Sequence, residues 1–598
     1  MINAIKRRNI DMDKVCKYLT YAFLILMVVW RIPFLNKGID YTDTGFNMTK
    51  YRDLFVDSSE NSIGIYFTQF VGSLIYNALP AYQLLVFRVL HLAIWSATFL
   101  IIFFTFRRPE PSYYNVGLSL LLLITSSYQK MGEAIFSYYP FSMLMVAIGI
   151  FLMYTGLIKD KKIRLLASGI VLGVNFGVRL PNLLFFSLVV VVFWYYVCKK
   201  EIKIGFIRSG IMLGGVAIGF AAMACFEVIM LGAGSAGDSL GGYVNLASDS
   251  NKNHGIFNQI IHIFQQIFLS MRSIVFYIGP VVLASLVFIL VYKAVFKKNM
   301  HKTYVNMLMY IVVALASIFW FELILVDRVT VFSFVHHFGL ISLVLAVISV
   351  FALANSHPEL SSASLIAIIS AGCIILGTDL GISRFADVLP QLCVSLMIAA
   401  TYIKPQSSKT KLCSFVGLYF NKICKVTVVV LIGITTMMSV AVMVPETYND
   451  ASVDKLTATP SESIVTLRGM KTTSERAQSL SNLYYAMQNE NIKDKPVAVI
   501  GMFPLIYNIA DNEKYFKQPC IDYNSVSADN LEEQYESKKS EGIYPVIVYS
   551  RLHMIQNGLN ELCDDPQKLE LFDKMRNDCE YTLVFTDENF DVYAPVAQ

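Results

Sequence analysis

The sequence predicts a mainly α-helical fold, a polytopic bundle of about thirteen transmembrane helices followed by a small α/β domain. Hydrophobic residues make up 55% of the 598 residues and charged residues only 16%, whereas a soluble globular protein carries roughly 25% charged residues. Apolar runs of roughly 20 residues, the length that crosses a bilayer, recur along most of the chain. This composition excludes a wholly soluble protein.

Charge divides the chain into two regions. The net charge is +5, but residues 1–445 carry a balance of +16 and residues 446–598 a balance of −11. A basic membrane region is typical of cytoplasmic loops rich in Lys and Arg, so it indicates topology and not nucleic-acid binding. We therefore assign residues 1–445 to the membrane body and residues 446–598 to a water-soluble domain, and we expect no nucleic-acid partner.

The apolar runs give the order of the predicted spans. They lie near residues 18–35, 84–106, 115–129, 139–158, 163–178, 180–198, 205–231, 272–296, 303–326, 329–353, 361–378, 385–403 and 426–445. No A-x-A cleavage site follows the first run, so we interpret it as an uncleaved span and not a signal peptide.

Orientation follows from the distribution of Lys and Arg. With the N-terminus in the cytoplasm, most of these residues fall in cytoplasmic segments, as the positive-inside rule requires. An odd number of spans then places the C-terminal domain outside. The runs at 115–129 and 163–178 are short, and losing one of them would reverse everything that follows. The protein is predicted to lie in a bacterial cytoplasmic membrane.

Two outer segments are long, residues 36–83 and residues 232–272. The first contains Ser62–Tyr76, where apolar residues at helical spacing are interrupted by Gly, Ser, Gln and Thr, a pattern that predicts a helix in the membrane interface. The second begins with a Gly-rich stretch and becomes amphipathic through Ile256–Phe268. Such a loop acts either as a lid over a pocket or as a plain linker.

The C-terminal domain is predicted to contain a small sheet and at least two helices. Strands are expected at 496–501 and 544–549, a hairpin at 581–585 and 590–593, and helices at 474–489 and 529–540. The ten cysteines include no CxxC pair, so neither a zinc site nor a dithiol redox centre is predicted.

Two carboxylates open the first outer segment, in Gly38-Ile-Asp40-Tyr-Thr-Asp43-Thr-Gly45. Spaced three residues apart, Asp40 and Asp43 would share one face of a helical turn. At the mouth of a bundle, partial desolvation would raise the pKa of one of them towards the range of a general base. The alternative is that both are solvated acids of an outer loop. Gly45 suggests a tight turn beside them.

A third acid, Glu133, lies in the next outer loop and on the same predicted side of the membrane as Asp43. It would bind a metal ion, orient an acceptor, or form an ion pair with Lys130. The ion pair is the simpler interpretation of the residue taken alone.

Basic residues on the same side are candidates for binding an anion. Arg179 lies between two spans and Arg88 at the outer start of the second span, where an arginine needs an anionic partner, a water-filled cavity or an escape to the interface. A lipid phosphate suits the guanidinium fork. The remaining candidates for this site are Arg384, Asp379, Lys252 and His254.

Ionisable residues within the spans suggest another class of protein. Glu227 and Glu322 are intramembrane acids of the kind that a proton-coupled transporter uses. His336 and His337 point about 100° apart on a helix, so they cannot both face one metal ion.

Taken together, these features resemble the GT-C superfamily of membrane glycosyltransferases, which includes protein O-mannosyltransferases and aminoarabinose transferases. The resemblance lies in the Asp40-Tyr-Thr-Asp43 loop after the first span, the Ile65-Tyr-Phe-Thr-Gln segment that leads to Phe87-Arg88, the acid of the next outer loop and the outer C-terminal domain. Many members carry an Asp-Glu pair where this chain has Asp-Tyr-Thr-Asp, which leaves two candidates for the base.

The resemblance implies transfer of a sugar from a polyprenyl-phosphate donor to an extracytoplasmic glycan, lipid or protein acceptor, with inversion at the anomeric carbon. Asp43, or Asp40, would be the base, and Arg179, Arg88 and Arg384 would stabilise the departing phosphate. A divalent metal is possible and no other cofactor is implied. The alternatives are a transporter or flippase of lipid-linked saccharides, or a polysaccharide polymerase or ligase.

Overall fold

The computed structural model describes residues 11–56, 64–128, 135–232, 234, 237, 256–295, 311–317, 331–376, 380–403, 423–434, 436, 446–447, 450–519, 521, 527–552 and 566–596. Within these ranges nine helices are long and apolar enough to cross a membrane, and two apolar helices are shorter, Ser112–Thr125 and Ile423–Ile434. A polytopic helical body is therefore confirmed, and thirteen spans stays a prediction.

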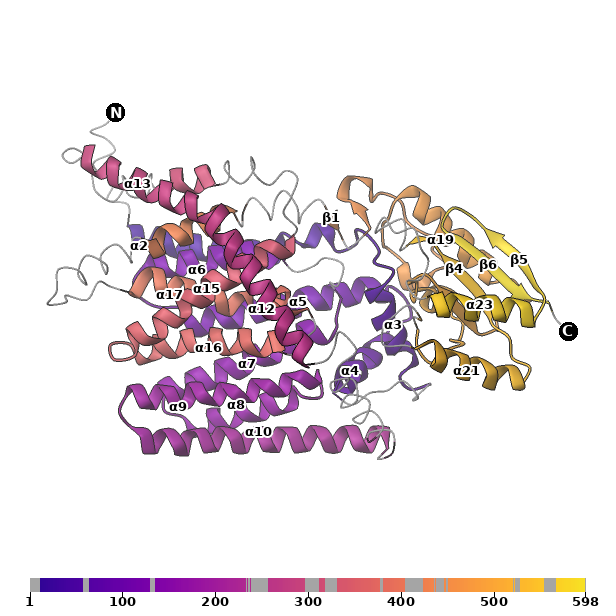
Figure 1. Ribbon diagram of the computed structural model, residues 1–598, viewed down its shortest axis with the longest axis horizontal. Helices are drawn as coiled ribbons and strands as arrows, with labels where there is room; N and C mark the ends of the chain where they lie inside the picture. The colour runs from indigo at the N-terminus through magenta and orange to yellow at the C-terminus, as the bar shows by residue number, and fades with distance from the viewer. Residues whose placement is uncertain are drawn as a thin grey trace.

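The helical body and the C-terminal domain lie side by side along the long axis of the molecule (Figure 1). The main helices of the body are α2 (Met12–Val29), α5 (Gln83–Phe106), α6 (Ser112–Thr125), α7 (Tyr138–Ile158), α8 (Lys162–Val174), α9 (Val189–Cys198), α10 (Ile202–Leu231), α12 (Ile256–Ser273), α13 (Gly279–Val295), α15 (Val331–Leu353), α16 (Pro358–Leu376) and α17 (Leu389–Tyr402). Two 3₁₀ segments, η5 (Leu180–Leu188) and η7 (Gly381–Val388), lead directly into α9 and α17.

Glycines bring α8 and α10 into close contact. An added methyl group would lie 2.1 Å from the Met212 carbonyl oxygen at Gly169, and 2.2 Å from backbone carbonyl oxygens of α8 at Gly215 and Gly219. Gly173 likewise faces the backbone of α10. Small residues four apart on both helices let the backbones touch, which is how helices associate where lipid removes the hydrophobic driving force.

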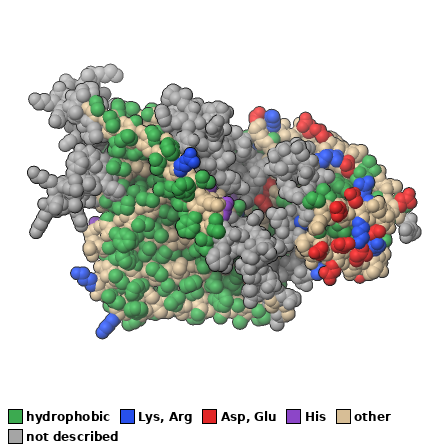
Figure 2. Space-filling model, in the orientation of Figure 1, with side chains coloured by type: hydrophobic (Ala, Val, Ile, Leu, Met, Phe, Trp, Pro, Cys, Tyr) green, Lys and Arg blue, Asp and Glu red, His purple; other side chains and the backbone are tan. Residues whose placement is uncertain are grey.

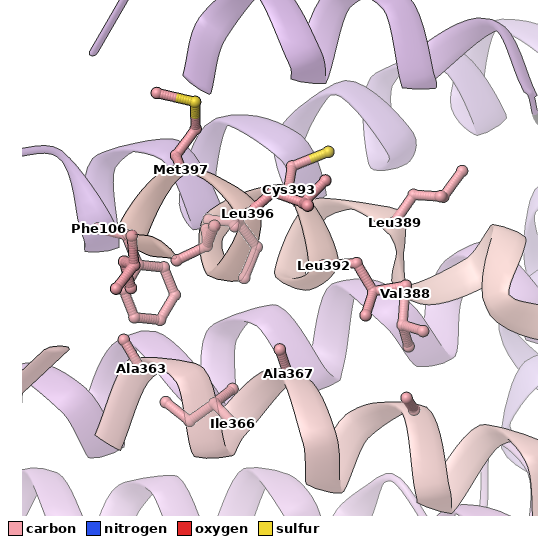
Figure 3. Close-up of a cluster of buried hydrophobic side chains, with 14 of the residues drawn as sticks. Phe106, Ala363, Ile366, Ala367, Val388, Leu389, Leu392, Cys393, Leu396 and Met397 are labelled. Atoms are coloured by element: carbon pink, nitrogen blue, oxygen red, sulfur yellow. The ribbon is translucent and has the colours of Figure 1, made fainter. Parts of the chain in front are cut away.

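The core of the body is formed by medium-sized apolar side chains. Residues of α16 and α17 interlock beside the end of α5 (Figure 3), and the labelled members of this cluster are Phe106, Ala363, Ile366, Ala367, Val388, Leu389, Leu392, Cys393, Leu396 and Met397. Alanines on α16 leave room for the larger side chains of α17, so the packing is dense without long side chains on both sides.

The second long outer segment differs from the prediction. Helix α12, a π-helical turn (Ile274–Ile278) and α13 follow one another without a break, and the apolar window suited to crossing a membrane is Gln259–Phe288. Arg272 therefore lies inside this helix and not at the start of a span. The π turn directly precedes Pro280, and such a turn accommodates a proline that lacks an N–H and crowds the preceding turn.

The elements predicted for the C-terminal domain are confirmed. Its four-stranded sheet has the order β3-β4-β6-β5, in which β3 and β4 are parallel and the other neighbours are antiparallel. The strands are β3 (Val497–Ile500), β4 (Val546–Ser550), β5 (Tyr581–Thr586) and β6 (Phe590–Pro595), and the helices are α19 (Ser474–Met487), α20 (Ile506–Ala510), α21 (Ala528–Ser540) and α23 (Pro566–Asp578). A short strand pair, β1 (Glu446–Thr447) and β2 (Ala451–Ser452), precedes them.

Surface composition separates the two parts. On the face seen in Figure 2, hydrophobic side chains cover the helical body, while acidic and basic side chains gather on the C-terminal domain. A surface of the first kind suits lipid and a surface of the second kind suits water, which agrees with the charge division along the sequence.

The first outer segment forms two helices between the body and the C-terminal domain, α3 (Asp43–Asp53) and α4 (Tyr66–Asn77) (Figure 1). Buried apolar residues of α3, of the start of α5 and of the C-terminal domain belong to one hydrophobic cluster, so this segment is part of the core that joins the two parts. Helix α4 confirms the helix predicted there, and its position in a membrane interface stays a prediction.

Candidate active site

The two carboxylates of the first outer segment have different environments. Asp40 precedes α3 and is fully buried; its Oδ2 accepts a hydrogen bond from the Thr44 backbone N–H at 2.7 Å and its Oδ1 one from the Thr42 hydroxyl at 3.0 Å. Asp40 thus caps the start of α3. Burial raises the pKa of its carboxyl above the ordinary value.

Asp43 is the first residue of α3 and is partly exposed to solvent. The positive end of the helix dipole favours a carboxylate at this position. The prediction that Asp40 and Asp43 share one face of a helical turn is wrong, because the helix begins only at Asp43. Of the two acids, Asp43 is the one that is exposed to solvent in part.

Gly45 has a different role from the predicted turn. It lies within α3, and an added methyl group would be 2.3 Å from the backbone nitrogen of Leu505 in the C-terminal domain. A glycine is therefore required here for the close approach of the two backbones, two residues after Asp43.

Two predicted phosphate-binding arginines meet at the start of α7. The Arg384 guanidinium lies over the Tyr139 ring at 3.8 Å from its centroid and donates a hydrogen bond to the Tyr139 hydroxyl at 2.6 Å. The Arg179 guanidinium lies 5.1 Å from the same centroid and 6.0 Å from that of Tyr138. We call Arg179 and Arg384 the arginine pair.

The segments that carry the arginine pair are fixed by polar contacts. Arg179 directly precedes η5, and Arg384 lies in η7 with Asp387 at 3.9 Å from its Nη1. The His336 ring on α15 bonds Ser383 at 2.9 Å, which ties η7 to the body. His336 is thus engaged by a hydroxyl, and its neighbour His337 is buried.

The first outer segment is hydrogen-bonded to the chain just before Tyr138 and to the chain just before Arg179. The Tyr51 hydroxyl of α3 donates to the Phe136 carbonyl oxygen at 2.8 Å, just before Tyr138. On α4, the Phe67 N–H donates to Gly177 at 3.1 Å and the Thr68 hydroxyl to Val178 at 3.1 Å, just before Arg179. Tyr138 and Arg179 therefore directly follow chain that is hydrogen-bonded to the first outer segment, which also contains Asp43.

Arg88 contacts the chain that leads into the first outer segment. It is fully buried in α5, and its Nη1 donates to the carbonyl oxygens of Leu35 at 3.2 Å and Lys37 at 3.1 Å. These bonds hold the chain that enters the first outer segment. Arg88 therefore positions this chain through its Nη1, and its role as a phosphate ligand stays a prediction.

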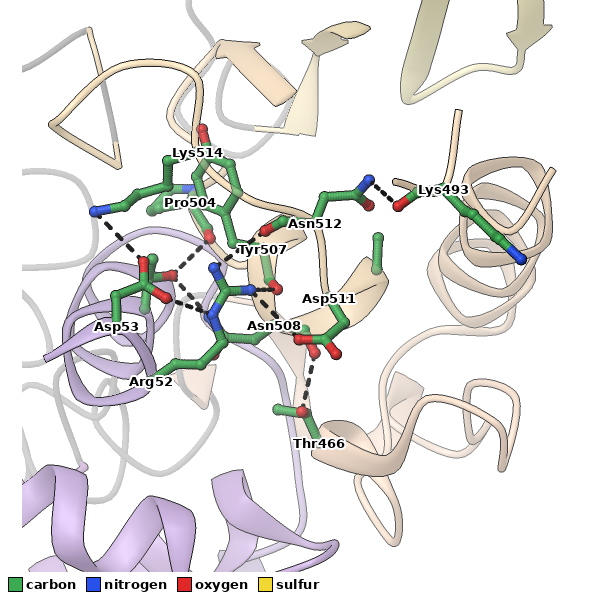
Figure 4. A network of polar contacts seen from close by, with 12 residues as sticks. Arg52, Asp53, Thr466, Lys493, Pro504, Tyr507, Asn508, Asp511, Asn512 and Lys514 are labelled. Atoms are coloured by element: carbon green, nitrogen blue, oxygen red, sulfur yellow. Dashed lines mark hydrogen bonds and ion pairs between the residues drawn. The ribbon is translucent and has the colours of Figure 1, made fainter. Parts of the chain in front are cut away.

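The C-terminal domain contacts the C-terminal end of α3 through polar side chains (Figure 4). Arg52 Nε pairs with Asp53 at 2.6 Å, and the Arg52 guanidinium donates to the carbonyl oxygens of Tyr507 and Asn512, the second at 3.1 Å. Lys514 Nζ lies 3.4 Å from the Asp53 carboxylate. We call Arg52, Asp53 and Lys514 the α3 clamp.

A second contact holds the chain just before α3. The Asp450 carboxylate accepts the Ile39 N–H at 2.9 Å and the Thr472 hydroxyl at 2.6 Å, and it pairs with Arg476. The Arg476 guanidinium also faces the Tyr41 ring at 5.9 Å. Both ends of α3 are therefore positioned by the C-terminal domain.

Glu227, considered as an ion-coupling acid, has a partner in the first outer segment. Its two carboxylate oxygens accept the Gly64 N–H at 3.2 and 3.1 Å, and the side chain is fully buried. Gly64 has φ +80°, a conformation that glycine adopts readily. Glu227 thus holds the turn that starts α4.

Several predicted site residues lie outside the residues that the structure describes: Glu133, Asp379, Lys252, His254 and the alternative acid Glu322. Their roles stay predictions. Within the described ranges, no group of three or more His, Cys, Asp and Glu side chains is placed to hold a metal ion.

The residues that sequence reasoning missed are aromatic or distant in sequence. Tyr138 and Tyr139 gave no signal beyond an aromatic pair before Pro140, and tyrosines at the end of a span usually mark the membrane interface. The α3 clamp joins residues more than 400 positions apart, which no local pattern reveals.

No protein-family model matches the sequence, and no curated protein matches it significantly. Among solved structures, the crystal structure of ArnT from Cupriavidus metallidurans in the apo state aligns with 96% of this chain and 98% of that chain. The sequence identity is 11% and the TM-score 0.48. A likeness of this strength assigns neither a family nor an activity, so function rests on the residues of this chain.

Proposed function

We propose that the protein is a membrane glycosyltransferase that moves a sugar from a polyprenyl-phosphate donor to a hydroxyl of an extracytoplasmic acceptor. The observation that carries the proposal is the convergence of Arg179 and Arg384 on Tyr139, with the chain before Tyr138 hydrogen-bonded to α3, the helix that begins with Asp43, and the chain before Arg179 hydrogen-bonded to α4. A phosphate-binding group and an accessible carboxylate are the two parts that the reaction needs.

The arginine pair suits a phosphate. Because both guanidinium carbons lie close to one ring centroid, they are within about 9 Å of each other. Two like charges that close, each on a side chain little exposed to water, are stabilised by an anion between them. Guanidinium forks bind phosphate oxygens with paired hydrogen bonds, and the tyrosine rings hold the forks in place.

The proposed reaction is a single displacement. Asp43 accepts the proton of the acceptor hydroxyl while that oxygen bonds to the anomeric carbon. The bond from the anomeric carbon to the phosphate oxygen breaks, and the polyprenyl phosphate leaves with the electron pair. The arginine pair stabilises the charge that develops on the phosphate, and the anomeric configuration inverts.

The C-terminal domain would set the position of the base. It contacts α3 at both ends, through the α3 clamp and through Asp450, so the carboxylate of Asp43 is held by a scaffold built from two parts of the chain. Catalytic groups that are fixed in this way lose little entropy at the moment of reaction. We also propose that this site faces the extracytoplasmic side of a bacterial cytoplasmic membrane.

The geometry favours a transferase over a transporter or flippase. The transporter hypothesis assigned ion coupling to Glu227, and this carboxylate is bonded through both oxygens to the backbone that starts α4. The hypothesis of a polymerase or ligase gains no specific support from the described contacts.

The test uses the full-length protein in lipid, radiolabelled polyprenyl-phosphate sugars and a membrane extract as the source of acceptor. We expect labelled product together with free polyprenyl phosphate, and a loss of at least about 100-fold in Asp43→Asn. Asp529→Asn is the matched control, because Asp529 is also an exposed acid in the first turn of a helix. If the wild type and Asp43→Asn both bind the donor and neither transfers its sugar, the transferase proposal is refuted.

A further inference from the structure

A polar cavity lies at the end of the helical body opposite the C-terminal domain (Figure 1). It has a volume of about 600 Å³ and is formed by the start of α2, the end of α5 and the start of α6. The cavity residue Arg108 bonds Tyr154 of α7, which lies 15 residues after Tyr139, so the cavity and the arginine pair are about 22 Å apart along this helix. The cavity lies on the side where the positive-inside rule places the cytoplasm.

Charges of both signs line the cavity. Lys17, Arg107 and Arg108 supply three cations, and Asp13 and Glu110 supply two carboxylates. Four of these side chains belong to exposed residues at the rim, and Arg108 is half-buried below them. Such a mixture complements a zwitterion better than a simple anion, because an anion would also meet the two carboxylates.

The deeper wall is held in place by hydrogen bonds. Arg108 Nη2 donates to the Tyr154 hydroxyl at 2.6 Å, and its backbone N–H donates to Asn115 at 3.0 Å. The Arg108 Nε is buried and has no hydrogen-bond acceptor among the described residues. The Tyr402 hydroxyl donates to the Glu110 carbonyl oxygen at 2.7 Å, which ties the loop to α17.

An exposed apolar stripe leads out of the cavity along α2. Tyr21 lines the cavity and is 46% exposed, and Ile25 and Val29 follow at helical spacing with 63% and 47% exposure. Residues four apart lie one above the other on a helix. A ligand with a polar head in the cavity would therefore rest its apolar part along this stripe.

We propose that the cavity binds the headgroup of a zwitterionic phospholipid that carries a primary ammonium, the phosphatidylethanolamine class. The phosphate is bound by Lys17, Arg107 and Arg108, and the ammonium by Asp13 and Glu110. The acyl chains lie along Tyr21, Ile25 and Val29. A primary ammonium donates hydrogen bonds to carboxylates, which a choline group cannot do, so the site discriminates between these two headgroups.

The experiment measures lipid retention by native mass spectrometry of the full-length protein. The protein is extracted from vesicles of phosphatidylethanolamine, phosphatidylcholine or phosphatidylglycerol with identical acyl chains. We expect at least tenfold greater retention of phosphatidylethanolamine than of phosphatidylcholine. Equal retention of these two, or preferred retention of phosphatidylglycerol, overturns the proposal.

Variants locate the binding to this cavity. The exposed pair Lys17→Ala with Arg107→Ala should abolish the retained lipid, and Asp13→Asn with Glu110→Gln should remove the preference over phosphatidylcholine while some lipid remains. The control is Lys161→Ala with Lys162→Ala, two exposed lysines at the start of α8. Retention that is unchanged in the first pair, or lost equally in the control, overturns the assignment.

Discussion

The α3 clamp and the arginine pair use the same residue type in different ways. In the α3 clamp, Arg52 is matched by the Asp53 carboxylate and by carbonyl oxygens of the C-terminal domain (Figure 4). In the arginine pair, the guanidinium groups lie over tyrosine rings, and the Asp387 carboxylate lies 3.9 Å from Arg384. The first cluster joins two parts of the protein, and the second is the group that we propose to bind a phosphate.

The comparison predicts its largest effect for the arginine pair. Arg179→Ala combined with Arg384→Ala should lower the transfer rate by about 1000-fold or more, because each lost donor to a developing oxyanion costs about 10²–10³ in rate. The rate is compared per folded molecule, because losing Arg384 also takes this cation away from the buried Asp387 carboxylate and lowers stability. Rates measured with labelled donor, beside a melting curve, check this prediction. A melting temperature that falls sharply while the residual rate per folded molecule is normal would contradict it.

For the α3 clamp, the expected loss is in stability and domain docking. Asp53→Ala leaves the Arg52 and Lys514 side chains, which are 14% and 5% exposed, without this carboxylate. Removing one partner of a buried pair costs about 3–5 kcal/mol. Hydrogen exchange of α3 should rise and the melting temperature should fall.

The control for the α3 clamp is Lys574→Ala. Lys574 pairs with Glu532 and Glu536 on the surface of the same domain, and exposed pairs contribute little to stability. If Asp53→Ala lowers the melting temperature no more than Lys574→Ala does, the α3 clamp does not hold the C-terminal domain against α3.

Asp40→Asn should have a smaller effect that depends on pH. The amide oxygen still accepts one helix-capping bond, so about 1 kcal/mol of stability is at stake. The folded pKa of Asp40 is raised by burial, so its carboxyl binds a proton more tightly in the folded state. The wild type therefore gains stability relative to Asp40→Asn at acid pH and loses it as the pH rises through the folded pKa.

Unfolding of both proteins in denaturant, measured from acid to neutral pH, gives this difference. A stability difference that is constant across the range would show that Asp40 is not a buried acid with a raised pKa. A variant with normal transfer activity at neutral pH would support Asp43 as the base.

Local patterns predicted much of the architecture. The strands β3 and β4, the hairpin of β5 and β6, and helices α19 and α21 lie where short apolar runs and turn residues placed them. These signals are local, since they depend on periodicity within a few residues. The run at Gln259–Phe288 was misplaced because an amphipathic stretch and an apolar stretch join in one helix, and hydropathy alone marks only the second.

Some members of the candidate site were identified from the sequence, and their catalytic roles stay predictions. Asp43, Arg179 and Arg384 were identified as residue types in outer segments, and the structure brings the two arginines together on Tyr139. The sequence alone could not show that Asp40 is buried and Asp43 is partly exposed, because this difference depends on where α3 begins. Contacts with distant residues such as Asp450 could not be predicted either, because residues that pair across the fold have no characteristic spacing in the sequence.

The most direct test of the central claim is a structure of the full-length protein in lipid with bound polyprenyl phosphate. The account predicts phosphate oxygens about 2.7–2.9 Å from guanidinium nitrogens of Arg179 and Arg384, the distance of charge-assisted hydrogen bonds. It also predicts that the Asp43 carboxylate faces the same space. A phosphate bound elsewhere, with the arginine pair still closed on Tyr139, would contradict the account.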